Sequence, residues 1–160
     1  MNIFYLDNNV KKCAEYHNNK HCVKMILEYA QLLSTAHRVI DGKDCSDILY
    51  KATHKNHPSA IWARENVENY NWLYSLFEAL SSEYKYRYEK THLSWVKLGE
   101  TLKYPPKNIP SGKFYPPTTA MPDSCKLDNS LDSYRNYYIT EKKHLFGWKD
   151  RLIPEWWIDC

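Results

Sequence analysis

Four polar residues recur at helical spacing between residues 21 and 31, and together their side chains could form an active site. Steps of three and four place His21, Lys24, Glu28 and Gln31 on one face of a helix. A carboxylate among basic groups stays ionised, so it can accept a proton or stabilise a developing positive charge. The same spacing also fits an ordinary solvated helix face, on which Lys24 and Glu28 form a surface ion pair.

A second group of basic residues, His54, His57 and Arg64, surrounds the start of the next predicted helix. If the two helices pack together, this group would converge with Glu28. The arginine fork is well suited to phosphate. Several aromatic residues are available to stack on bases, although core packing explains most of them better: Tyr5, Tyr50, Trp62, Tyr70 and Trp72. This composition suits an anionic, glycosidic ligand such as a nucleotide or DNA.

Four histidines form two close pairs, His17 with His21 and His54 with His57, and histidines at such a spacing can bind a metal ion. Asn18-Asn19 interrupt the pair of His17 and His21, which also lacks the Glu that follows the first His in metalloprotease helices. The pair of His54 and His57 is explained locally, because a His before Pro58 can cap a helix start. Hydrogen bonding and acid–base chemistry are the commoner uses of histidine, so we predict no metal and no other cofactor.

Helices must position these residues, and the hydrophobic spacing predicts where they lie. After a short apolar arm at residues 2–6, the run Asp7-Asn8-Asn9 can cap a helix over about 9–16. A longer helix then runs to about Ile40 and ends at Asp41-Gly42. Its expected core stripe is Val23, Ile26, Leu27, Ala30 and Leu33.

The apolar pattern of residues 59–88 predicts a long central helix that begins after Pro58. A short helix follows around residues 93–102, and the chain then becomes Pro-rich over 104–122. We expect this stretch to wrap the surface, anchored by Phe114, Tyr115 and Met121. A last helix over about 130–145 precedes an aromatic tail, Ile153-Pro154-Glu155-Trp156-Trp157, that should dock on the body.

The composition indicates one compact, all-α domain over residues 1–160. We divide it into a helical core (1–92), the Pro-rich wrap (104–123) and a C-terminal helix and tail (130–160). The chain has 4 Gly against 14 Tyr and 6 Trp, which argues against disorder and against a Gly-rich phosphate loop. Five scattered cysteines, with neither a secretion signal nor an apolar run long enough for a bilayer, favour the cytoplasm.

The order of several short motifs resembles a known family. His21, Glu28 and His37-Arg38 lie in one helix after a short N-terminal arm. The later motifs are Asn56-His57-Pro58, Trp62-Ala63-Arg64, Asn69-Tyr70-Asn71-Trp72-Leu73 and Glu83-Tyr84-Lys85-Tyr86-Arg87-Tyr88. This order resembles the pyrimidine-dimer DNA glycosylase family, small all-helical proteins of phages and bacteria, over about residues 1–92. A composition rich in Lys, Asn and Tyr also resembles that of tailed-phage proteins, which would place the chain in the host cytoplasm.

The resemblance implies an amine mechanism. In the family, the α-amine of the mature N-terminus attacks the deoxyribose C1′, which gives a Schiff base and then strand cleavage. Glu28 matches the family's helix Glu, which stabilises the sugar cation and relays protons, and His21 matches its helix His. Since the size of Asn2 disfavours removal of the preceding residue, the nucleophile would be the Met1 amine or Lys24. The damaged base would be reached by nucleotide flipping. Phosphate and nucleotide contacts are assigned to His54, His57, Arg64, Gln31, Trp62 and Tyr70.

Two other functions stay open on the sequence. The net charge of +3 is low for a duplex binder, which favours a phage anti-defence protein that binds or cleaves a small nucleotide signal. A cyclic dinucleotide or an ADP-ribose derivative would be such a signal. The aromatic tail would also suit a structural or partner-binding protein, including a homo-oligomer. The expected partners are therefore DNA or a small nucleotide, without a membrane.

Overall fold

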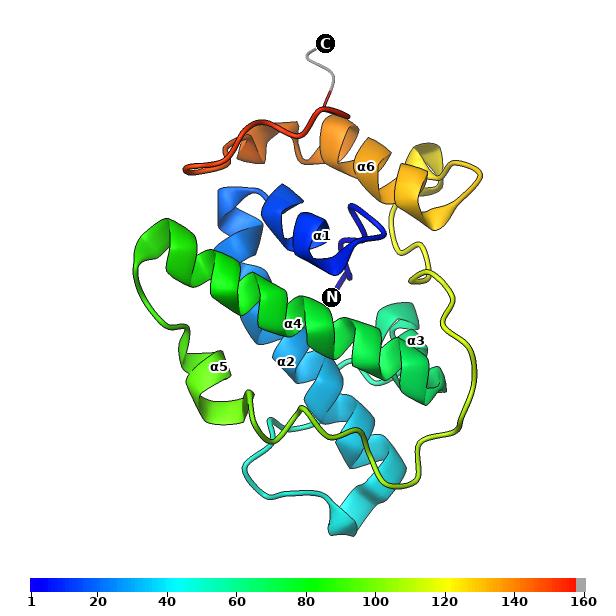
Figure 1. The fold of residues 1–160 in the computed structure, drawn as a ribbon. Coiled ribbons are helices and arrows are strands. Elements are labelled where there is room, and N and C mark those ends of the chain that lie inside the picture. Colours follow the sequence, from blue (N-terminus) through cyan, green and yellow to red (C-terminus); the bar gives the residue numbers. More distant parts are fainter. Residues whose placement is uncertain (158–160) are drawn as a thin grey trace.

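The computed structural model describes residues 1–157, and its regular elements there are all helical. Two long helices, α2 (Asn19–Asp41) and α4 (Val67–Tyr88), pack against each other through the middle of the molecule (Figure 1). The other α-helices are α1 (Val10–Tyr16), α3 (Pro58–Glu65), α5 (Leu93–Leu98) and α6 (Ser130–Glu141). Short 3-10 helices lie at Gly42–Asp44, Asp123–Cys125 and Lys143–Leu145. The predicted all-α class is confirmed.

A cap begins α1 and a glycine ends α2 where the sequence predicted them, and a cap that was not predicted begins α2. The Asn9 side chain accepts a hydrogen bond from the Lys12 N–H and begins α1. Asn18 accepts from the His21 N–H at 2.8 Å and begins α2. Gly42 ends α2 with φ of 55°, a backbone conformation that glycine adopts without the strain of a side chain.

The predicted central helix of about 59–88 is wrong as one continuous element, because the chain breaks at Asn66. That residue has extended backbone angles (φ −156°, ψ 167°) and separates α3 from α4. Its side-chain oxygen accepts from the Asn69 N–H at 2.9 Å, so it caps the second helix instead of continuing the first. Its side-chain amide donates to the Lys113 carbonyl, which ties the wrapping segment to the break.

The predicted core stripe of α2 is also partly wrong. Val23 and Leu27 are about two-fifths exposed, whereas Ile26, Ala30 and Leu33 are buried. The buried face is rotated toward residues that the periodicity did not select: His21, Cys22, Met25, Tyr29 and Leu32. This rotation follows from the two-sided packing of α2, which contacts α4 on one side and α3 on another.

The segment between α5 and α6 follows the outside of the molecule as an extended wrap (Figure 1). The Asp41 carboxylate accepts from the Lys107 and Asn108 N–H groups. The Val67 N–H donates to the Pro110 carbonyl. Of the expected anchors, Met121 is buried, while Phe114 and Tyr115 are partly exposed and edge-on to Trp62.

The C-terminal part of the described chain lies over the N-terminal arm and α1 (Figure 1). The last helix ends at Glu141, earlier than predicted, and a 3-10 turn follows it. The aromatic tail docks as expected, with the Trp156 ring packed edge-on against Tyr16 and the Trp157 ring against Trp148. The part of the tail at residues 158–160 lies outside the described residues.

One hydrophobic cluster runs from Ile3 to Trp148 and takes side chains from all six α-helices. Within residues 1–157, no helix combines the length and apolar character that a bilayer crossing requires. The described cysteines Cys13, Cys22, Cys45 and Cys125 carry free thiols, and Cys160 lies outside the described part.

Candidate active site

The N-terminal arm is buried inside the protein, and this fixes the position of the Met1 backbone. Ile3, Phe4, Tyr5 and Leu6 are each at most 4% exposed. The Cys13 thiol donates to the Phe4 carbonyl at 3.1 Å and accepts from the Leu6 N–H at 3.4 Å. The arm has no regular secondary structure, and its anchored backbone places the terminal amine beside α2.

The α-amine of Met1 meets the carboxylate of Glu28 at this point. Its nitrogen lies 3.8 Å from Oε1 of Glu28. The Nζ of Lys24 lies 3.6 Å from the other oxygen, Oε2. Glu28 is 16% exposed and Lys24 is 61% exposed, so the carboxylate is largely enclosed whereas the lysine reaches solvent. A primary amine beside an ionised carboxylate can add to a carbonyl carbon or C1′ of a sugar, with the carboxylate moving the proton.

The charge of the same amine acts on His57. Burial lowers the pKa of His57, and the positive charges of the chain's α-amine and of His54 lower it further. Its Nδ1 accepts from the Ser59 N–H at 3.0 Å, as the capping interpretation predicted, so in the neutral ring the proton is on Nε2. His57 is thus a neutral side chain whose Nε2 can donate a hydrogen bond.

The remaining basic candidates lie around α3 and its approach. His54 is exposed, has φ of 47° and shares a hydrogen bond with Thr53 through Nδ1. Arg64 follows His57 by seven residues, which places it two turns along the same side of α3. Burial lowers the pKa of Arg64, and its Nη1 is buried without a hydrogen-bond partner. Gln31 is half-buried on α2, three residues after Glu28.

Three predicted site residues are instead enclosed in the core. His21 is 5% exposed, stacks on Phe4 with ring centroids 4.2 Å apart and shares a 2.6 Å hydrogen bond with the Tyr138 hydroxyl. Burial lowers the pKa of His21 to about 2. Trp62 is 1% exposed and donates through Nε1 to the Tyr115 carbonyl. Tyr70 is fully buried and donates to the Leu102 carbonyl at 2.7 Å.

Buried polar atoms without a partner are concentrated on residues of this region. In the part of the chain that the structure describes, six buried side-chain atoms make no hydrogen bond, and three of them belong to Asn2, Glu28 and Arg64. Such atoms are rare in folded proteins and mark positions that suit a polar ligand. Sequence reasoning did not select Asn2, although its place beside the terminal amine was a usable signal.

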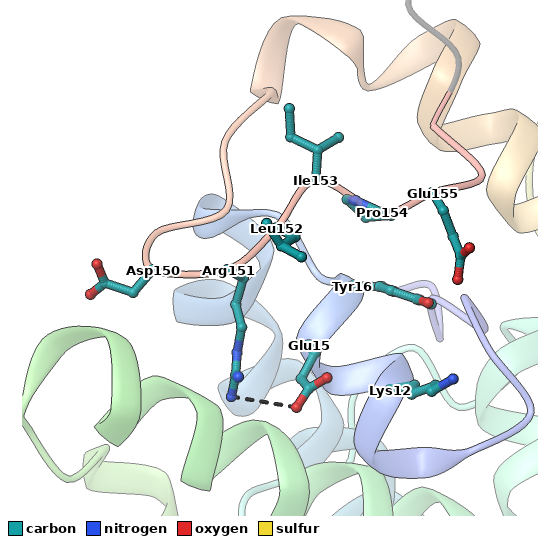
Figure 2. Close-up of a pocket in the computed structure, with 9 residues that line it drawn as sticks. All are labelled: Lys12, Glu15, Tyr16, Asp150, Arg151, Leu152, Ile153, Pro154 and Glu155. Carbon is teal, nitrogen blue, oxygen red and sulfur yellow. Dashed lines mark ion pairs between the residues drawn. The ribbon is translucent and has the colours of Figure 1, made fainter.

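Two hollows on the described surface lie away from this amine. One has a volume of about 560 Å³ and runs beside the C-terminal tail, where Arg151 points toward Glu15 (Figure 2). The other, of about 570 Å³, lies between α1 and α4 and shares Glu15 and Arg151 with the first. Neither is lined by Met1 or Glu28.

Comparison with known families places this geometry in context. The family model described as pyrimidine dimer DNA glycosylase matches residues 1–96. The chain belongs to this family. The resemblance noted over about residues 1–92 is therefore confirmed. A DNA glycosylase-type function and a DNA partner are supported at the level of the family. Neither the comparison with curated proteins nor that with solved structures found a match.

The matched region contains every residue of the candidate site. The arm, α1, α2, α3 and α4 all fall within residues 1–96, and with them the Met1 amine, Glu28 and His57. The wrap, α6 and the tail lie beyond the match. The glycosylase family therefore accounts for the helices that bring the amine and the carboxylate together.

Proposed function

We propose that this protein is a DNA glycosylase with abasic-site lyase activity, in which the Met1 α-amine is the nucleophile and Glu28 the catalytic carboxylate. The observation that carries the proposal is the 3.8 Å approach of the Met1 nitrogen to Glu28 Oε1 within a chain of the glycosylase family. The amine attacks the deoxyribose C1′, the bond from C1′ to the damaged pyrimidine breaks, and the base leaves with that electron pair and takes up a proton. The nitrogen then loses a proton, and the C1′–O4′ bond breaks as O4′ takes up a proton, which gives a ring-opened imine. This imine permits loss of a C2′ proton and elimination of the 3′ phosphate.

The surroundings favour Met1 over Lys24 as the nucleophile. An α-amine is a weaker base than a lysine side chain, so a larger fraction of it is neutral and nucleophilic at pH 7. The arm also holds the Met1 amine in place, whereas the Lys24 side chain is largely in solvent. We assign Lys24 the roles of pairing with Glu28 and of contacting phosphate.

Basic side chains around the amine would hold the DNA backbone. We assign phosphate contacts to Arg64, His54 and His57, with Gln31 as a further polar contact. The unpartnered Nη1 of Arg64 supports its assignment, because a guanidinium nitrogen there can bind a phosphate oxygen. Trp62, Tyr70 and His21 receive packing roles in this proposal, since their polar atoms are already bonded within the protein.

The test is borohydride trapping on a duplex that contains one abasic site. We expect a covalent adduct that mass spectrometry of peptides places on the Met1 nitrogen. Glu28→Gln should slow adduct formation roughly a hundredfold, within the range that general acid–base groups contribute. Lys24→Ala should retain the adduct. Glu78→Gln, a change at an exposed carboxylate of α4, is the matched control and should keep the full rate.

Two results would contradict the proposal. One is the absence of any trapped adduct from the unaltered protein, and the other is an unchanged rate in Glu28→Gln. A duplex with a pyrimidine dimer, compared with its undamaged counterpart, then tests the lesion class by strand cleavage, because the detached base stays linked to its neighbour. An adduct on abasic DNA without cleavage at the dimer would leave the lyase step in place and exclude that lesion.

A further inference from the structure

Two consecutive residues of α2 contact two different points near the start of the chain. Glu28 lies beside the Met1 amine, and the next residue, Tyr29, accepts a hydrogen bond from the Phe4 N–H at 3.1 Å through its hydroxyl. Successive residues of a helix point about 100° apart, so one turn of α2 can reach both places. Three residues of extended chain span at most about 10 Å, which limits how far the amine can move once Phe4 is fixed.

The Tyr29 hydroxyl is itself held by a buried histidine. His17 lies at the C-terminal end of α1, and its Nδ1 is 2.7 Å from the Cys13 carbonyl. Because a carbonyl only accepts, Nδ1 carries the ring proton and Nε2 is the acceptor. Nε2 is 2.7 Å from the Tyr29 hydroxyl, which therefore donates to His17 while it accepts from Phe4.

At neutral pH, each group in this series of hydrogen bonds keeps its role as donor or acceptor. Burial lowers the pKa of His17 to about 4, so the ring is neutral and its Nε2 remains an acceptor. Burial also raises the pKa of Tyr29 well above its ordinary value, so the phenol keeps its proton. Both side chains are fully buried, and water does not compete for their bonds.

We propose that Tyr29 is a positioning residue that holds the Met1 α-amine against Glu28 through the Phe4 backbone. This inference rests on the proposed function, because it concerns the same amine. Tyr29 acts on the arm through its hydrogen bond to the Phe4 N–H, and not through a hydrogen bond to the amine or the carboxylate. Removal of its hydroxyl should leave the amine present and nucleophilic but no longer held at the carboxylate.

The protein contains a matched control for this role. Tyr138 is also a buried tyrosine whose hydroxyl bonds a buried histidine, His21, at 2.6 Å. Its second bond is to the Asn18 N–H at the start of α2, not to the arm backbone. Tyr29→Phe and Tyr138→Phe therefore remove equivalent buried hydroxyls and keep both rings. Only the first releases the Phe4 N–H.

The experiment measures single-turnover adduct formation on the abasic duplex together with the affinity for that duplex. We expect Tyr29→Phe to slow adduct formation at least about tenfold while the dissociation constant stays within about twofold, because small misplacements of reacting groups lower rates strongly. Tyr138→Phe should keep the full rate. Equal slowing in both variants, or a full rate in Tyr29→Phe, would overturn the positioning role.

Amide hydrogen exchange at Phe4 gives a readout that does not depend on catalysis. The exchange rate of this amide should increase in Tyr29→Phe and not in Tyr138→Phe. If the unaltered protein forms no adduct, the proposed function fails, and the exchange result alone decides whether Tyr29 fixes the arm. Unchanged exchange at Phe4 in Tyr29→Phe would overturn the inference whatever the enzymatic result.

Discussion

Burial divides the histidines of the site region into two kinds. His17 and His21 are enclosed, and each is bonded to a buried tyrosine hydroxyl, so they act as neutral structural groups. His57 is only partly buried, and the charge of the α-amine opposes its protonation. The same residue type therefore supports the core at two positions and offers a neutral hydrogen-bond donor at a third. A histidine in the sequence does not reveal which of these environments it will occupy.

Because these histidines are buried, we expect acid to destabilise the fold already at pH values above those at which carboxylates titrate. The pKa of His17 is lowered to about 4 and that of His21 to about 2, whereas an unfolded histidine takes up its proton near 6.5. Between pH 6.5 and pH 5 the unfolded chain binds more protons, so the free energy of unfolding falls as the pH falls. Each histidine should contribute roughly 1.4 kcal/mol per pH unit there.

Urea unfolding at pH 7.5, 6.0 and 5.0 checks this prediction. The pKa values of Glu83 and Asp41 are lowered from ordinary values of 4.5 and 3.8. These two carboxylates therefore affect stability only below pH 5. His37, His57 and His92 are shifted in the same direction and add to the slope. His21→Gln removes one contributor and should make the pH dependence shallower. An equal free energy of unfolding at all three pH values would refute the assignment.

The break between α3 and α4 is the feature of greatest consequence at the scale of elements. One asparagine both begins α4 and binds the wrap, through its Oδ1 bond to the Asn69 N–H and its Nδ2 bond to the Lys113 carbonyl. The wrap passes so close that a Cβ at Gly112 would lie 2.8 Å from the Cβ of Asn66. The break thus turns α3 away from the axis of α4 and gives the segment after α5 a fixed place to cross.

Asn66→Ala should reduce the free energy of unfolding by about 1–2 kcal/mol, the cost of a lost helix cap. Asn66→Asp keeps the accepting oxygen and loses only the bond to Lys113, so its effect should be smaller. Asn71→Ala, an exposed change inside α4, is the control and should be neutral or slightly stabilising, since alanine favours helices. Thermal unfolding measures all three; equal melting temperatures for Asn66→Ala and Asn71→Ala would contradict the capping role.

At the scale of the whole molecule, a buried ion network joins segments that are distant in sequence. Glu83 is 4% exposed and accepts from Arg87 at 2.8 Å within α4 and from Arg151 of the tail at 2.8 and 3.0 Å. Arg87 also donates to the Glu15 carbonyl of α1 and to the Asn19 side chain of α2. The C-terminal layer beyond the family match is therefore fixed to the helices that carry the amine site (Figure 1).

Arg87→Met should be strongly destabilising, by about 3–5 kcal/mol, because it leaves a buried carboxylate with one partner fewer. The exposed ion pair between Lys126 and Asp123 gives a comparison, since its nitrogen–oxygen distance is also short at 3.0 Å. Lys126→Met should change the free energy of unfolding by about 1 kcal/mol or less. Chemical denaturation measures the free energy of unfolding of both variants. An equal decrease in the two would disprove the structural role of the network.

The sequence by itself determined the features that depend on neighbours a few residues away. The cap at Asn9 and the end of α2 at Gly42 lie where local hydrogen bonding and backbone freedom predicted them. The four-residue spacing of Lys24 and Glu28 likewise predicted their pairing, and the structure shows it at 3.6 Å. The order of motifs was enough to predict the family that the family model then matched.

Only the tertiary structure decided which of these side chains are available for chemistry. His21 belongs to the predicted polar face of α2, yet Phe4 and Tyr138 enclose it, from positions 17 residues before and 117 residues after it. Tyr29 lies beside Glu28 in sequence, but its role depends on the Phe4 backbone 25 residues away. Spacing within a helix reports which residues share a face. Burial depends on what the rest of the chain packs against that face, and this decides whether a polar group meets solvent, a ligand or the core.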